Sequence, residues 1–242
     1  MEIEAVNQAY DTFSKYKVSR HLDVCTNCCM TIEDERKLLG LPLKQISVEL
    51  LSAYNDSAKS KKTNVDEIKH FLPRYLELIS EYQFPSHSIE LSLTRLAPFD
   101  KNEWKESELN IIDKFSCEFF NHCLDTYPIP SFGDKIDSII IMFWKIGIGI
   151  DNLLLIWEKS ESLESCLHFK DLYFEGFEYY NRGKLTNGFG DNLLCEKLTT
   201  WIQTPKTKEI MLKRIEKIIQ GKFRVDKQAV YDFTLLYESL MK

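Results

Sequence analysis

The sequence predicts an all-α protein of about ten helices, stacked as antiparallel hairpins, with a HEAT-like stack as one form of this architecture. Glycine and proline are scarce, at nine and seven of 242 residues, so few positions interrupt a helix. Apolar residues recur at three- and four-residue steps, the spacing of one helix face. With 44% hydrophobic and 28% charged residues, the composition is that of a globular chain. We expect one helical domain over residues 1–242, with a subdivision near 128–134.

Apolar stripes and capping residues predict six helices before residue 130. Thr31 and Asp34 match a capping box, and Ser47 is the expected N-cap of the third helix. Pro73 removes a helical N–H inside the fourth helix, which predicts a kink or a restart. Pro128 and Pro130 end the sixth. The expected helices cover residues 3–17, 32–39, 48–58, 65–79, 86–96 and 102–127.

The second half begins with residues 134–157, which are apolar nearly all round and predict one central, buried helix. Within it, the β-branched run Ile139 to Met142 is also compatible with a strand. Ser162 is the expected N-cap of the following helix, and Gly183 its expected end. The remaining expected helices cover residues 163–180, 191–202, 206–220 and 227–240.

The charge balance limits the classes of partner. The chain has 31 basic and 37 acidic residues, a net charge of −6, which disfavours a general electrostatic grip on nucleic acid or on an anionic membrane. The first residues show no signal-peptide pattern. The most apolar stretch, 136–157, contains Asp137, Lys145 and Asp151, which argues against a bilayer span. We therefore expect a cytoplasmic protein without a membrane partner.

A sulfur-rich segment precedes the second helix. Seven cysteines, an odd number, favour thiols over a disulfide framework. His21, Cys25, Cys28 and Cys29 have a spacing that can wrap a tetrahedral ion such as zinc, although no second spaced pair follows. The favoured interpretation is that the thiols pack as small hydrophobic groups. A redox role for the Cys-x-x-Cys pair is the third alternative.

No familiar catalytic motif is found. The sequence contains no Gly-x-Ser-x-Gly elbow, no phosphate-binding loop and no His-Glu-x-x-His pair, so we assign no catalytic residue and, zinc apart, no cofactor. His70 and Arg74 flank the helix-breaking Pro73. They either point into a cleft or, as we favour, pack and satisfy carbonyls freed by a kink.

Charge is segregated in the second half of the chain. Residues 158–178 are mainly acidic and rich in aromatic residues, whereas residues 206–224 are mainly basic. Two solvated helix faces explain this pattern, but aromatic anchors beside carboxylates are also typical of a protein–protein interface. The candidate partner-binding residues are Glu164, Asp171, Tyr173, Glu175, Glu178 and Tyr179.

Three motifs carry a resemblance. They are Leu22-Asp23-Val24-Cys25 with Cys28-Cys29-Met30, Ala53-Tyr54-Asn55-Asp56-Ser57-Ala58, and His70-Phe71-Leu72-Pro73-Arg74. Through them, residues 10–100 resemble a family of uncharacterised bacterial cytosolic proteins. In size, mild acidity and lack of catalytic motifs, the chain is also similar to the immunity proteins of contact-dependent growth inhibition toxin systems. That likeness implies a non-enzymatic interaction protein that binds and neutralises a cognate, basic toxin domain. The alternatives are a zinc-binding protein or metalloenzyme using the His21–Cys29 cluster, and a helical scaffold for another partner.

Overall fold

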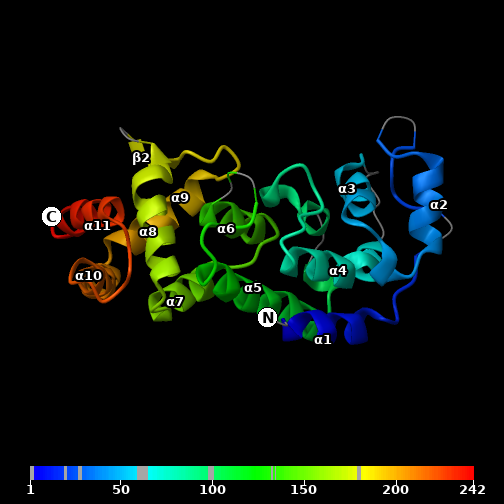
Figure 1. Ribbon diagram of the computed structural model, residues 1–242. Coiled ribbons are helices and arrows are strands. Elements are labelled where there is room, and N and C mark those ends of the chain that lie inside the picture. Colours follow the sequence, from blue (N-terminus) through cyan, green and yellow to red (C-terminus); the bar gives the residue numbers. More distant parts are fainter. Residues whose placement is uncertain are drawn as a thin grey trace. The chain divides into compact units, whose positions relative to one another are not determined.

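A computed structural model describes residues 3–18, 21–26, 29–58, 65–97, 101–131, 133, 135–178 and 181–242. The all-α class and the expected number of about ten helices are confirmed (Figure 1). No helix within the described ranges is both long and apolar enough to span a bilayer.

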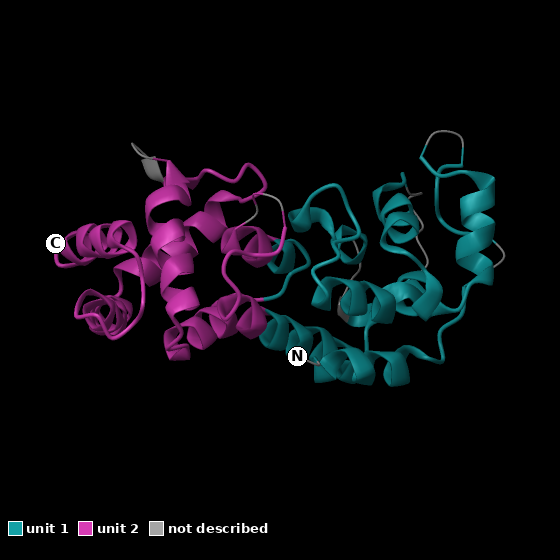
Figure 2. Cartoon of the chain, viewed as in Figure 1, with its two compact units in different colours: residues 1–119, 142–148 teal, residues 120–141, 149–242 magenta. Residues whose placement is uncertain are grey.

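The chain divides into two compact units (Figure 2). Unit 1 comprises residues 1–119 and 142–148, and unit 2 comprises residues 120–141 and 149–242. Two helices, α5 (Glu106–Leu124) and α6 (Ile136–Lys145), contribute residues to both units.

Unit 1 begins with helices whose starts agree with the sequence. The Thr31 hydroxyl accepts a hydrogen bond from the Asp34 N–H at 3.0 Å, and Ser47 accepts one from the Leu50 N–H at 3.3 Å, so both predicted N-caps are confirmed. Helix α4 is continuous through Pro73 and does not restart there. The elements of this part are α1 (Glu4–Phe13), α2 (Ile32–Gly40), η1 (Leu43–Gln45), α3 (Val48–Asp56) and α4 (Val65–Ser80).

The predicted helix over 86–96 is wrong. The chain instead forms two short 3-10 turns, η2 (Ile89–Leu91) and η3 (Thr94–Leu96), and a third, η4 (Lys101–Glu103), precedes α5. The hydroxyl of Ser88 donates to the Glu90 carboxylate and does not cap a helix. These turns direct a charged side chain, Arg95, into the interior, where it is 1% exposed.

Arg95 binds the carbonyls of two other backbone segments of unit 1. Its Nε donates to the carbonyl of Tyr54 at 2.7 Å, and its two terminal nitrogens donate to the carbonyls of Asp23 and Ser57, each at 3.1 Å. The guanidinium also lies 4.0 Å from the centre of the Tyr54 ring. One buried side chain thus fastens the segment after His21 to the end of α3.

A second buried charge in unit 1 is paired. Lys69 on α4 and Glu108 on α5 have side chains 3% and 0% exposed, with Nζ and Oε2 2.9 Å apart. The Tyr16 hydroxyl donates to the other oxygen of Glu108 at 2.5 Å, and Lys69 donates to the Glu103 carbonyl at 2.6 Å. Burial alone would raise the pKa of Glu108, but hydrogen bonds to its carboxylate from Tyr16, Lys69, the Lys105 N–H and Lys15 lower it to about 2.

Residues 134–157 form two helices instead of the predicted one. Helix α6 ends at Lys145 and α7 (Asp151–Lys159) begins six residues later. Gly147 has φ +80°, a conformation that L side chains rarely adopt, and the Ile148 N–H bonds back to the Phe143 carbonyl. The strand alternative for Ile139 to Met142 is also wrong, because those residues lie inside α6, where they are fully buried as expected.

The next helix is shorter than predicted. Helix α8 (Leu163–Glu175) starts after Ser162 as expected, but it ends before Gly176 and not at Gly183. The chain then forms an antiparallel hairpin of β1 (Phe177–Glu178) and β2 (Asn181–Leu185), in which Phe177 and Leu185 are paired and buried. The last helices agree with the sequence to within one residue at each end: α9 (Asn192–Gln203), α10 (Pro205–Ile219) and α11 (Lys227–Leu240).

Candidate interaction surface

The predicted acidic and aromatic face of α8 is only partly exposed. Asp171 and Tyr173 are 9% and 7% exposed, which corrects their placement on an outer face. Asp171 accepts a hydrogen bond from the Tyr127 hydroxyl at 2.8 Å and lies 3.3 Å from Lys170 Nζ. The charge of Asp171 is therefore balanced by groups within unit 2. Tyr179 lies outside the described residues.

The other carboxylates of this face reach the surface. Glu164 is half-buried, Glu175 forms an ion pair with Lys135, and Glu178 lies 2.8 Å from Lys184 Nζ. Both ion pairs are solvent-exposed, and exposed ion pairs contribute little to the stability of a protein. These residues can influence the approach of a partner more than they can anchor it.

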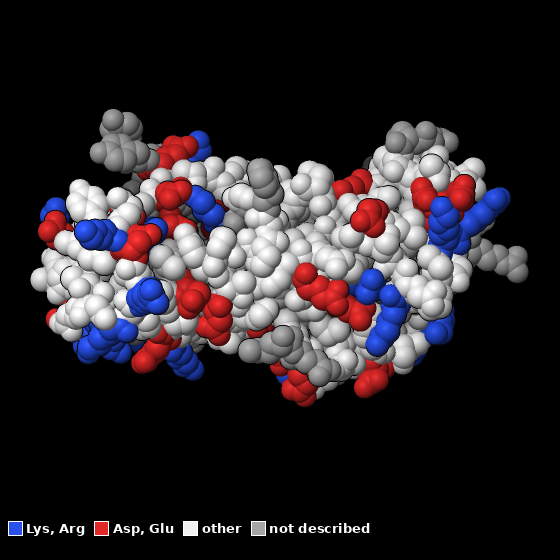
Figure 3. All heavy atoms as spheres, viewed as in Figure 1, with Lys and Arg blue, Asp and Glu red and all other residues white. Residues whose placement is uncertain are grey.

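The segregated charges of the sequence meet within the fold. Lys206 Nζ on α10 lies 2.6 Å from Glu158 Oε2 on α7, and Lys217 Nζ lies 3.9 Å from Glu161. Arg214, which is 8% exposed, donates to the carbonyls of Trp157 and Glu158 at 3.0 and 2.5 Å and so caps the end of α7. On the face of unit 2 that Figure 3 shows, basic side chains lie among acidic ones. The acidic and basic stretches of the sequence therefore neutralise part of each other's charge.

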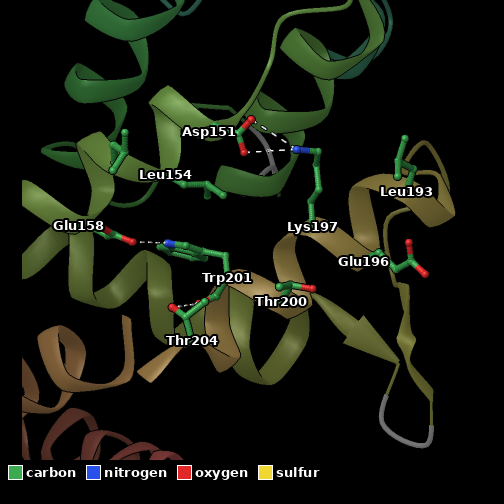
Figure 4. Close-up of a pocket in the computed structure, with 10 residues that line it drawn as sticks. Asp151, Leu154, Glu158, Leu193, Glu196, Lys197, Thr200, Trp201 and Thr204 are labelled. Atoms are coloured by element: carbon green, nitrogen blue, oxygen red, sulfur yellow. Dashed lines mark hydrogen bonds and ion pairs between the residues drawn. The ribbon is translucent and has the colours of Figure 1, made fainter. Parts of the chain in front are cut away.

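A groove of about 660 Å³ lies between α7 and α9 (Figure 4). Each helix contributes residues at the three- and four-residue spacing of one helix face. Leu154 and Trp201, 6% and 7% exposed, form the floor, whereas Leu155 and Leu193 are 43% and 56% exposed. The lining residues are Asp151, Leu154, Leu155, Glu158, Leu193, Glu196, Lys197, Thr200, Trp201 and Thr204.

Two polar links hold the walls of this groove together. Asp151 on α7 lies 3.3 Å from Lys197 Nζ on α9, and the Trp201 indole N–H donates to Glu158 Oε1 at 3.0 Å. Although burial raises the pKa of Glu158, hydrogen bonds from Lys206, Trp201 and Thr207 lower it overall, so the group stays charged at neutral pH.

The core holds the floor of the groove in place. The Trp201 ring packs against Trp157 and Phe169, with ring centres 5.2 and 5.8 Å apart. The groove is therefore preformed, which lowers the entropic cost of binding.

Helix-face spacing in 151–158 and 193–204 was visible in the sequence, but which apolar residues stay exposed depends on tertiary packing. Leu155 and Leu193 were therefore missed as candidates. Of the described residues, the other exposed large hydrophobic side chains are Ile32 in unit 1 and Phe174, Phe189, Tyr231, Leu235 and Met241 in unit 2.

The proposed zinc ligands do not meet among the described residues, which contain no group of three His, Cys, Asp or Glu side chains able to hold a metal. His21 is 90% exposed and lies 3.8 Å from Glu35, Cys25 is half-buried, and Cys29 is exposed. Cys28 lies outside the described residues. The backbone here is held by polar bonds, since the Cys25 N–H donates to Ser57 Oγ at 2.9 Å.

His70 and Arg74 both bind carbonyls of other segments. His70 Nδ1 lies 3.0 Å from the Tyr16 carbonyl, and Arg74 Nε donates to the Ile46 carbonyl at 2.8 Å. Arg74 also pairs with Glu77 at 2.5 Å. Both side chains therefore satisfy carbonyl groups, which is the interpretation we favoured. These carbonyls belong to neighbouring segments and not to α4.

No protein-family profile, no curated protein and no solved structure matches the chain.

Proposed function

We propose that this chain is an interaction protein that binds a protein partner through the α7–α9 groove. Most concretely, it is an immunity protein that binds and neutralises a cognate toxin domain. The single observation that carries the interaction is the preformed groove with two exposed leucines, Leu155 and Leu193, beside a buried tryptophan. Exposed apolar side chains around a buried aromatic residue are typical of binding hot spots.

The charge of the chain supports a basic partner. The net charge is −6, and among the groove residues three carboxylates face one ammonium group. Opposite charge on the partner raises the association rate and selects against acidic proteins. The toxin identity of the partner rests on the resemblance to immunity proteins.

The test pairs the full chain with the product of the gene adjacent to its own. We expect a stoichiometric complex by native mass spectrometry, and rescue of growth when the chain is co-expressed with that product. A neighbouring product that is toxic but neither binds the chain nor is neutralised by it contradicts the immunity function.

Charge reversal at Glu175 on α8 and at Glu178 on β1 separates the two candidate faces. We expect Glu175→Lys with Glu178→Lys to weaken the partner complex less than about threefold, because both carboxylates already pair with lysines at the surface. Leu155→Ala with Leu193→Ala is expected to weaken it more than about tenfold, since each truncation removes apolar contact. Titration calorimetry of both double variants measures this. A complex lost with the Glu175→Lys, Glu178→Lys variant and kept with the groove variant places the interface at the end of α8 and on β1.

A further inference from the structure

We infer that the α7–α9 groove takes a cationic amphipathic helix of the partner, about three turns long; this rests on the proposed function and specifies its ligand. The groove is walled by two helices, so its surface consists of helix ridges and grooves. A third helix packs between two such walls by placing its own apolar stripe over their ridges.

The length of the occupant follows from the wall. Residues that line the groove on the α9 side run from Leu193 to Thr204, which is eleven residue steps. At about 1.5 Å per residue this is roughly 16 Å, the length of three helical turns. A helix of that length presents at least four apolar side chains, at i, i+3, i+4 and i+7, to Leu155, Leu193 and the Trp201 floor.

The charge of the occupant follows from the rim. Lys197 pairs with Asp151 and Lys206 with Glu158, whereas within the described residues Glu196 is in no ion pair. Glu196 lies three residues after Leu193 on α9, and both residues line the groove (Figure 4). The Asp151 side chain is also 76% exposed. A helix whose apolar stripe is flanked by lysine or arginine places cations beside Glu196 and Asp151.

The test uses a synthetic, helix-stabilised peptide of about 18 residues, with leucine at i, i+3, i+4 and i+7 and lysine on both flanks. Its matched control has glutamate in place of every lysine. Fluorescence anisotropy with the full chain is expected to show binding of the lysine peptide only, weakened several-fold between 50 and 300 mM salt. Equal binding of the glutamate peptide, or binding of neither, overturns the inference.

Variants of the full chain show where the peptide binds. Leu155→Ala with Leu193→Ala is expected to weaken peptide binding about tenfold or more. Ile32→Ala changes a residue of unit 1 that is as exposed as Leu193, and is expected to leave peptide binding unchanged. Glu196→Lys is expected to weaken binding more than Glu238→Lys, an exposed site on α11 with the same charge change. Thermal unfolding by circular dichroism confirms that each variant is folded. Groove variants that bind as the wild type does overturn the inference.

Two further outcomes separate this inference from the proposed function. If the adjacent gene product binds the wild type and the Leu155→Ala, Leu193→Ala variant equally, the groove inference falls, and the interaction stands without the groove as its site. If the lysine peptide binds as expected but the gene product does not, the immunity function falls and the groove inference stands. A free chain that dimerises through these leucines, shown by sedimentation, assigns the groove to a second copy and overturns the inference.

Discussion

Arg95→Met is expected to lower the free energy of unfolding by at least about 3 kcal/mol. Arg95 is 1% exposed and donates to the carbonyls of Asp23, Tyr54 and Ser57. Methionine fills much of the same volume but donates no hydrogen bond, so each of the three carbonyls loses its charged donor, although that of Tyr54 keeps a further bond, from the Ser57 N–H. The loss is a large part of the 5–15 kcal/mol that typically stabilises a protein.

Urea unfolding followed by circular dichroism measures this effect. The matched control is Arg36→Met, because Arg36 is exposed on α2 of the same unit and its replacement is expected to change stability by less than about 0.5 kcal/mol. Equal midpoints for the two variants would show that Arg95 does not hold unit 1 together.

Lys69→Met is expected to lower the free energy of unfolding by about 3–5 kcal/mol, since it leaves the Glu108 carboxylate buried without its closest counter-charge. Lys69→Met combined with Glu108→Leu is expected to recover part of this loss, because the second change removes a buried carboxylate whose remaining counter-charge is the half-exposed Lys15. Lys37→Met, which breaks the exposed pair with Glu33, serves as the control and is expected to cost less than about 1 kcal/mol.

The same pair predicts how stability depends on pH. The pKa of Glu108 is lowered from 4.5 to about 2, so the native state holds this proton less tightly than the unfolded chain does. Its contribution to stability is fully present above about pH 4.5 and is lost as the pH falls towards 2. Urea unfolding at a series of pH values measures the slope, and Glu108→Gln should reduce it. An identical slope in that variant would assign the acid sensitivity to other groups.

Local signals predicted much of the fold. Hydroxyl caps at Thr31, Ser47 and Ser162 predicted helix starts that the structure confirms, because capping depends on residues close in sequence. The break between α6 and α7 was missed, since an all-round apolar pattern shows no change of face where the chain turns. The interior position of Arg95 was also missed, because its three acceptors lie 38 to 72 residues away in sequence.

The sequence predicted that a partner surface lies in the second half of the chain, but not which residues form it. A partner surface in the second half of the chain was expected, yet the sequence pointed to Asp171 and Tyr173, which the fold buries, and not to Leu155 and Leu193, which it exposes. Composition shows which residues can form an interface, whereas their exposure depends on how α7, α8 and α9 pack. The same holds for the acidic stretch, part of whose charge is neutralised by α10.

Hydrogen exchange measured by mass spectrometry, on the full chain with and without its partner, tests the central claim most directly. If the partner occupies the α7–α9 groove, amide protection increases in 151–159 and 192–204 and stays nearly unchanged in 163–175. Protection that increases along α8 while 151–159 and 192–204 exchange as in the free chain would contradict the account.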